Sequence, residues 1–251
     1  KQFAHLGIYP QTEHNQFTLR LFSLCGILTL QQLMFFKNLL QEHQIEHIHF
    51  TTGQNIHLHN LTIEKLTPII LSALEQDLFS GTVEKLPLHI GLSPLSGVSV
   101  LECFDPTYYA KFISDYFANA NDETLQNTYK IAFSNSKQDT AFATVSDVGF
   151  VAAAKKGKPM FRLYLAGGMH KTILPAIAYP ELIEPNEVLL YTLAYIKLAE
   201  SLATDHGKPC AILQDMGQTF LSQYQNSVQA MRLKHDLPAI RHTPTDRKSV
   251  V

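Results

Sequence analysis

The chain has 251 residues, of which 45% are apolar and 17% are charged, and it contains 12 Gly and 12 Pro. This composition is typical of a globular protein of one or two domains, and it excludes a disordered or collagen-like chain. The 20 Lys and Arg residues nearly balance the 22 Asp and Glu residues, so the basic surface that nucleic-acid binding requires is missing. We therefore expect no nucleic acid among its partners.

The first predicted elements are a strand and a helix. Phe17–Leu24 is apolar and rich in β-forming residues, which indicates a strand. Thr29 then provides an N-cap for a segment whose apolar side chains recur at helical spacing as far as Leu40. The sequence therefore predicts a strand followed by a helix.

The segment Ile48–Leu58 has the period of two that is typical of strands. Gly53 and Gln54 predict a hairpin turn or bulge at its middle. One predicted face is apolar and consists of Ile48, Phe50, Ile56 and Leu58. The opposite face is polar and consists of His49, Thr51, Gly53, Asn55 and His57.

A second helix is predicted from Thr62 or Thr67 to Gln76, with Pro68 tolerated only near its first turn. The first unit thus has the order β-α-β-β-α. A segment rich in Gly, Pro and Ser follows at Gly81–Gly97 and predicts a linker. We therefore expect two domains, one covering residues 1–80 and the other covering residues 81–251.

The second domain is predicted to mix strands and helices. Asp105 and Pro106 provide an N-cap and a first residue for a helix that extends to Asn119. The predicted strands are Lys130–Phe133, Val148–Ala153 and Met160–Ala166, with a basic turn at Lys155–Lys158 and an end to the sheet at Gly167 and Gly168. The predicted helices that follow run from Pro185 or Asn186 to Thr204 and between Cys210 and Arg232, before a polar tail that begins at Leu237.

Histidines are the first candidates for a binding site. His47, His49, His57 and His59 lie on the polar face of the predicted strand pair, where alternate side chains project together. Two such histidines can bind a metal ion, but no carboxylate or thiolate with ligand spacing accompanies them. We therefore predict no metal site here.

Other chemical motifs are weak. Cys25, Cys103 and Cys210 are too few and too far apart for a disulfide framework or a four-thiolate iron–sulfur cluster. The segment Gly91–Gly97 differs from a nucleophile elbow in its glycine spacing and in the proline that follows Ser93. No apolar run approaches the roughly 20 residues of a membrane-spanning helix, and the N-terminus lacks the pattern of a signal peptide. We expect a cytoplasmic protein without a membrane partner.

Several segments together resemble the siroheme-dependent nitrite/sulfite reductases. Gly7–Gln11 is similar to the opening motif of that family, and His49–His59 is similar to its signature strand pair. The segments that follow in the family's order are Ser93–Gly97, Lys130–Ser134, Ser146–Ala153 and Phe161–Gly168. The order of these segments is more specific than any one of them.

The resemblance implies an α+β fold with a ferredoxin-like half-domain at residues 1–80 and a nitrite/sulfite-reductase-like α/β domain at residues 81–251. Members of the family contain two copies of this unit, and this chain contains one. The copy that holds the iron–sulfur cluster has cysteines where this sequence has Ser136 and Thr140. The resemblance is therefore to the N-terminal, cluster-free half, and we expect no cluster from this chain alone.

The sequence departs from the family at the cations that contact siroheme. Siroheme carries eight carboxylates, so its site needs several arginines and lysines. Lys130 is kept, and Arg20 lies two positions from an expected arginine. At the positions of the family's other cations, this sequence has Phe22, Gly53, Leu88 or His89, and Thr128.

The resemblance implies an oxidoreductase, or half of one, that reduces a small oxyanion at siroheme with a cluster supplied elsewhere. The candidate catalytic residues are Lys130 and Arg20, and the candidate cofactor-binding residues are His49, Thr51, Gly53, Asn55, His57 and His59. The alternative is a degenerate, non-catalytic relative that binds an anion or a tetrapyrrole, or that acts in assembly. The expected partners are a second half or an electron-donor protein, together with a second copy of the chain in a homodimer.

Overall fold

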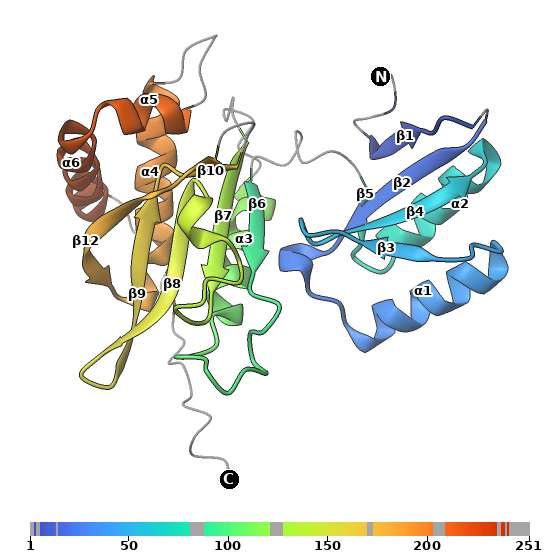
Figure 1. Ribbon diagram of the computed structural model, residues 1–251, viewed down its shortest axis with the longest axis horizontal. Helices are drawn as coiled ribbons and strands as arrows, with labels where there is room; N and C mark the ends of the chain where they lie inside the picture. Colours follow the sequence, from blue (N-terminus) through green and yellow to red (C-terminus); the bar gives the residue numbers. More distant parts are fainter. Residues whose placement is uncertain are drawn as a thin grey trace. The chain divides into compact units, whose positions relative to one another are not determined.

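The computed structural model describes residues 3, 6–13, 15–80, 88–120, 128–169, 173–202, 209–234, 237, 238 and 240. The chain divides into two compact units, residues 1–87 and residues 88–251 (Figure 1). Part of the predicted linker at 81–87 and the predicted helix end at Thr204 lie outside the described residues, as does most of the tail. Among the described residues, no helix is both long and apolar enough to cross a membrane.

The first unit is a small antiparallel sheet with two helices on one face (Figure 1). The strand order is β1-β2-β4-β3, and β5 pairs with β2. The elements in chain order are β1 (Ile8–Pro10), β2 (Phe17–Phe22), α1 (Leu30–Glu42), β3 (Ile48–Phe50), β4 (Asn55–Leu61), α2 (Ile63–Leu74) and β5 (Phe79–Ser80). The predicted order β-α-β-β-α is therefore present, with a short strand added at each end.

Local sequence signals explain where the first helix begins. The Thr29 side chain accepts a hydrogen bond from the Gln32 backbone N–H at 3.2 Å. The Gln32 side chain in turn accepts one from the Thr29 backbone N–H at 2.9 Å, which completes a capping box. The predicted N-cap at Thr29 is confirmed.

The second helix corrects a prediction about proline. Thr62 precedes α2, so the helix begins at Ile63 and the alternative start at Thr67 is wrong. Pro68 consequently lies in the helix interior rather than in the first turn. Proline there cannot donate to the carbonyl of Glu64, and the helix continues because the packing of Leu66 and Ile69 holds it against the sheet.

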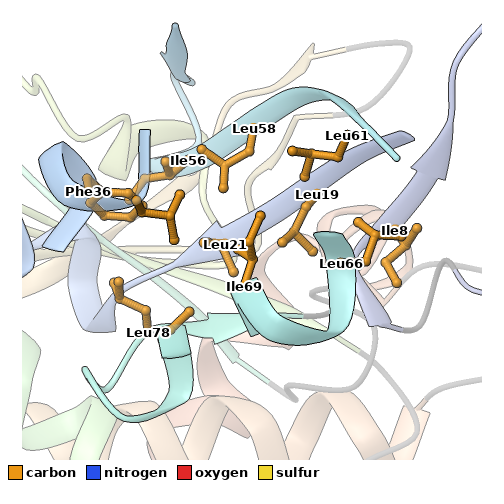
Figure 2. Packing of buried hydrophobic residues seen from close by; sticks show 12 residues of the cluster. Ile8, Leu19, Leu21, Phe36, Ile56, Leu58, Leu61, Leu66, Ile69 and Leu78 are labelled. Atoms are coloured by element: carbon orange, nitrogen blue, oxygen red, sulfur yellow. The ribbon is translucent and has the colours of Figure 1, made fainter. Parts of the chain in front are cut away.

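The core of the first unit lies between the sheet and its helices (Figure 2). Leu19 and Leu21 on β2 and Ile56 and Leu58 on β4 have at most 2% exposure. They pack against apolar side chains of both helices, namely Phe36, Leu39, Leu66, Ile69 and Ala73. Burying this continuous apolar layer provides the main stabilisation of the unit and leaves the opposite face of the sheet polar.

Phe50 belongs to the predicted apolar face but is exposed. It pairs with Ile56 in the register, but its side chain is 55% exposed, whereas that of Ile56 is 2% exposed. Phe50 ends β3, which is an edge strand. Its side chain therefore lies beyond the part of the sheet that the helices cover.

The second unit is a mixed five-stranded sheet with the order β12-β9-β8-β7-β6. Pairing is parallel from β6 to β8 and antiparallel from β8 to β12. The strands are β6 (Leu88–Leu92), β7 (Tyr129–Ser134), β8 (Val148–Lys155), β9 (Lys158–Leu165) and β12 (Ile177–Ile183). A separate pair consists of β10 (Gly168–Met169) and β11 (Ile173–Leu174). The predicted turn at Lys155–Lys158 joins β8 to β9.

Helices cover one face of this second sheet. They are α3 (Thr107–Ala120), α4 (Val188–Leu202), α5 (Pro209–Asp215) and α6 (Gln218–Lys234). The Tyr129 hydroxyl on β7 donates to Glu200 on α4 at 2.7 Å. The Tyr224 hydroxyl on α6 donates to the Tyr191 carbonyl on α4 at 2.8 Å, so α6 packs on α4.

The expectation that the sheet ends at Gly167 and Gly168 is wrong, because β12 adds an antiparallel edge strand beside β9. This strand contains Pro180, at a register shift between Ala178 and Leu182. A proline is tolerated in a sheet at such an edge irregularity because no ladder hydrogen bond is required there.

Candidate functional site

The polar face of the first sheet carries the predicted binding residues. Arg20 on β2 pairs with His57 on β4, and His57 pairs with His49 on β3. Directly paired residues project to the same side of a sheet, so these three side chains form one row across three strands. His59 follows His57 by two residues and projects to the same side.

The histidine rings lie close to one another. The ring centroids of His49, His57 and His59 are 5.9 to 6.0 Å apart in all three pairs. The ring of His47 is 6.4 Å from that of His59. The predicted clustering of histidines on this face is therefore present in the structure.

A layer behind His59 fixes its ring. The Thr18 hydroxyl oxygen lies 3.0 Å from Nδ1 of His59, and the Gln11 side-chain amide donates to the same hydroxyl oxygen at 2.9 Å. Sequence reasoning did not single out Thr18 or Gln11. The alternation of Thr18 with Arg20 along β2 was the signal that could have found Thr18, because both project to the polar face.

The other predicted residues of this face build the β3–β4 turn. The Thr51 hydroxyl accepts a hydrogen bond from the Asn55 backbone N–H at 3.0 Å, and the Asn55 side chain donates to the Gly53 carbonyl at 3.2 Å. The residue with a positive φ is Gln54, at 59°, rather than Gly53. Thr51 and Asn55 therefore have structural roles in the turn.

Burial and nearby positive charge both lower the pKa of histidines on this face. Burial lowers the pKa of His57 below its ordinary value, and the positive charge of Arg20 lowers it further. Burial also lowers the pKa of His59, with smaller contributions from His49 and His47. His57 and His59 are therefore favoured in the neutral form at physiological pH, and Arg20 carries the fixed positive charge of their row.

Two nitrogens of this face are shielded from solvent and have no hydrogen-bond partner among the described residues. They are Nε2 of His57 and Nε of Arg20. The Arg20 guanidinium also lies over the Tyr9 ring, 5.5 Å from its centroid. Buried polar atoms without partners are rare, so this face has unused capacity for a ligand.

Lys130, the other predicted catalytic residue, belongs to the second unit. Its backbone N–H on β7 donates to the Asp147 carboxylate at 2.9 Å, and its ammonium lies 5.9 Å from the centre of the Phe142 ring. Burial lowers the pKa of Lys130, and the carboxylates of Asp147 and Asp139 oppose this effect. Lys130 is thus a half-buried cation with acidic neighbours in its own unit.

The loop after β7 has no ligands for an iron–sulfur cluster. The Thr140 hydroxyl lies 2.6 Å from the Ser93 hydroxyl, and Ser136 is buried. The three cysteines of the chain, Cys25, Cys103 and Cys210, lie in separate elements. A four-iron cluster requires four thiolates in one place, so the residues present do not fit it.

Comparison with known proteins identifies the fold and the family. Residues 9–75 match the family model for the nitrite/sulfite reductase ferredoxin-like half domain. Residues 85–208 match the model for the nitrite and sulphite reductase 4Fe-4S domain. The chain belongs to the nitrite/sulfite reductase family. This result confirms the predicted resemblance to the family and the predicted α+β fold.

Individual relatives of this nitrite/sulfite reductase family member are distant. It is 28% identical over 183 residues to the ferredoxin–nitrite reductase of Synechococcus elongatus. This match covers 68% of this chain and 35% of that protein. The chain superposes on the solved structure of the Mycobacterium tuberculosis NirA protein with a TM-score of 0.72 and 19% identity. That match covers 96% of this chain and 49% of NirA. The chain therefore spans about a third of the first relative and about half of the second.

The family binds siroheme, and the residues of this chain fit such a group only in part. Arg20 and Lys130 are the cations that the resemblance of sequence places at or near family positions. Phe22, near which an arginine is expected, stacks on Phe79 with ring centroids 5.6 Å apart. An apolar ring pair cannot neutralise a carboxylate, so the described residues of the polar face do not form a complete site for an octa-anion.

Proposed function

We propose that this chain acts as the cluster-free half of a nitrite/sulfite-reductase-type oxidoreductase, and that a second half holds most of the siroheme and all of the iron–sulfur cluster. The observation that carries the proposal is the match of nearly the whole chain to half of a solved family structure. The lack of cysteines at the expected cluster-ligand positions of this chain agrees with this division. The second half is a further part of the same protein, a separate chain or a second copy of the unit.

The contribution of this half is to bind and orient an anion. Arg20 is the residue that would pair with a siroheme carboxylate, because a guanidinium presents two parallel donors to it. His57 and the neighbouring groups His49, Thr51, Gly53, Asn55 and His59 line the same strand pair. Siroheme, when bound, supplies the iron at which a small oxyanion is reduced. Lys130, the other predicted catalytic residue, lies in the second unit, and its role toward the oxyanion stays a prediction.

One observation favours a second candidate function. The stacked pair of Phe22 and Phe79 occupies the part of β2 where the family has an arginine. If the remaining cations are too few to bind a tetrapyrrole, the chain is a non-catalytic relative that binds a smaller anion or acts in assembly. The two functions differ in whether the chain binds siroheme at all.

A siroheme titration of the full chain, followed by absorption, distinguishes these functions. We expect the siroheme Soret band to shift and to saturate at one siroheme per chain, with an affinity in the micromolar range because few cations are present. Arg20→Met should weaken binding by about tenfold, since a hydrogen bond to a charged group contributes roughly 1.5–3 kcal/mol.

Lys155→Met provides the matched control, because Lys155 is an exposed lysine of the β8–β9 hairpin. This variant should bind siroheme as the parent chain does. A chain that shows no saturable shift would contradict the reductase proposal and leave the second candidate. Equal weakening by Arg20→Met and Lys155→Met would show that only net charge matters.

A further inference from the structure

We propose that His49, His57 and His59 form a binding site for a divalent transition-metal ion such as Zn²⁺. One ring nitrogen from each residue lies within 4.8 Å of a ring nitrogen of the other two. This site goes beyond the proposed function and does not depend on it, because its ligands all come from the β3–β4 hairpin of this chain. It departs from the expectation of no metal site, which rested on the lack of a carboxylate or thiolate with ligand spacing beside the histidines.

The strand pair holds the three ligands in place. His49 and His57 are direct cross-strand partners, and His59 is the next residue of β4 on the same face. A tetrahedral zinc ion with bonds of about 2.05 Å requires ligand nitrogens roughly 3.3 Å apart. The three nitrogens therefore need to approach one another by roughly 1.5 Å, which side-chain rotations on a fixed backbone can provide.

The hydrogen bond behind His59 prepares one of its ring nitrogens for a metal. Nδ1 of His59 lies 3.0 Å from the Thr18 hydroxyl oxygen and 3.4 Å from the Gln11 side-chain nitrogen, and in one tautomer the hydroxyl oxygen accepts a hydrogen bond from an Nδ1–H. In that tautomer, Nε2 carries a free lone pair. A metal-binding histidine usually has such a partner on its other nitrogen, because this partner fixes the tautomer and the ring orientation.

His57 provides an independent indication of a ligand. Its Nε2 atom is shielded from solvent and has no hydrogen-bond partner among the described residues. A buried imidazole nitrogen without a partner is unfavourable, and coordination to a metal ion removes this cost. His49 is exposed, so the site is open to solvent on the side of β3.

The ligand set selects the class of ion. Three neutral imidazoles favour zinc, copper or nickel, whereas magnesium and calcium prefer oxygen ligands. Three protein ligands also leave one coordination position open for water or an anion. Arg20 lies opposite His57, and its positive charge opposes a dication, so we expect an affinity in the micromolar range.

Isothermal titration of the full chain with Zn²⁺ tests the site. We expect one Zn²⁺ per chain, and we expect the absorption of Co²⁺ added in its place to show the intense visible bands of low-symmetry coordination. His49→Asn should weaken Zn²⁺ binding by about 100-fold, because removing a ligand is at least as severe as removing the partner of a ligand. His57→Asn should have a similar effect.

His43→Asn is the matched control, because His43 follows α1 and is not one of the three clustered ligands. It should retain the Zn²⁺ affinity of the parent chain. If His57→Asn fails to fold, the exposed His49 decides the result, with circular dichroism as the check on folding. The absence of saturable 1:1 binding, or equal affinities of His49→Asn and His43→Asn, would overturn the site. Neither result would alter the siroheme titration, so the two proposals fail separately.

Discussion

Asp139 organises the loop that follows β7 through hydrogen bonds to its carboxylate. The Ser134 hydroxyl and the Ala143 backbone N–H donate to one carboxylate oxygen at 2.6 and 2.7 Å. The backbone N–H and the hydroxyl of Thr144 donate to the other oxygen at 2.9 and 2.6 Å. This loop carries Ser136 and Thr140, so one carboxylate stabilises the segment in which other family members place cluster ligands.

We therefore predict that Asp139→Ala lowers the free energy of unfolding by about 3 kcal/mol. Each hydrogen bond to a charged group contributes roughly 1.5–3 kcal/mol, and bonds to one carboxylate are not additive. Asp139→Asn should lose less, because an amide oxygen still accepts part of the network and asparagine tolerates the positive φ of 49°. Urea unfolding followed by circular dichroism measures both changes.

Asp215→Ala is a control of the same chemistry, because Asp215 is exposed at the end of α5. It should change stability by no more than about 0.5 kcal/mol. Equal effects at Asp139 and Asp215 would contradict the structural role of the Asp139 carboxylate.

Residue alternation predicted most residues of the candidate site, but it did not predict their cross-strand contacts. A period of two places His57 and His59 on one face whatever the fold, so these residues could be predicted. The pairing of His49 with His57 and the hydrogen bond between Thr18 and His59 depend on the register between strands. The sequence alone does not define that register. For the same reason, the alternation places Phe50 on the apolar face but does not predict its exposure at a sheet edge.

At the scale of elements, strong local signals were sufficient. The helix after Thr29, the turn at Lys155–Lys158 and the strands beside that turn are present as predicted. The strands that sequence reasoning missed are β1, β5, β6, β10, β11 and β12. β6 corrects the linker predicted at Gly81–Gly97, because residues 88–92 of that segment form a strand of the second sheet. β1 and β5 have three and two residues, which is too short for a periodic pattern, and β12 contains a proline.

Close backbone contacts were also beyond sequence reasoning. A Cβ atom at Gly149 on β8 would lie 2.0 Å from the Ala143 carbonyl oxygen, and one at Gly167 would lie 2.6 Å from the Ser146 carbonyl oxygen. These glycines allow the segment Ala143–Ser146 to pack directly on the sheet. Glycine is required at these positions because two segments approach each other in the folded chain. A glycine in a predicted strand indicates such a close approach but does not identify the other segment.

At the scale of the whole molecule, the chain consists of two units with separate cores. In the first unit, β3 is an edge strand, and the face of the sheet opposite the helices is polar. Because the family joins two such half-domains, we predict that a solitary chain forms a C2 homodimer. Sedimentation velocity should then report a particle of about two chains. A monomer at high concentration would contradict this prediction.

In the proposed function, this chain completes a siroheme reductase centre without holding all of it. The most direct test of this function is turnover of nitrite and of sulfite, with reduced viologen as the electron donor, by the full chain purified from a siroheme-producing host. We expect no turnover above the buffer rate by a sample that still binds siroheme in the titration, because three cysteines cannot hold the four-thiolate cluster that would relay electrons. Sustained reduction of either anion by the chain alone would contradict it.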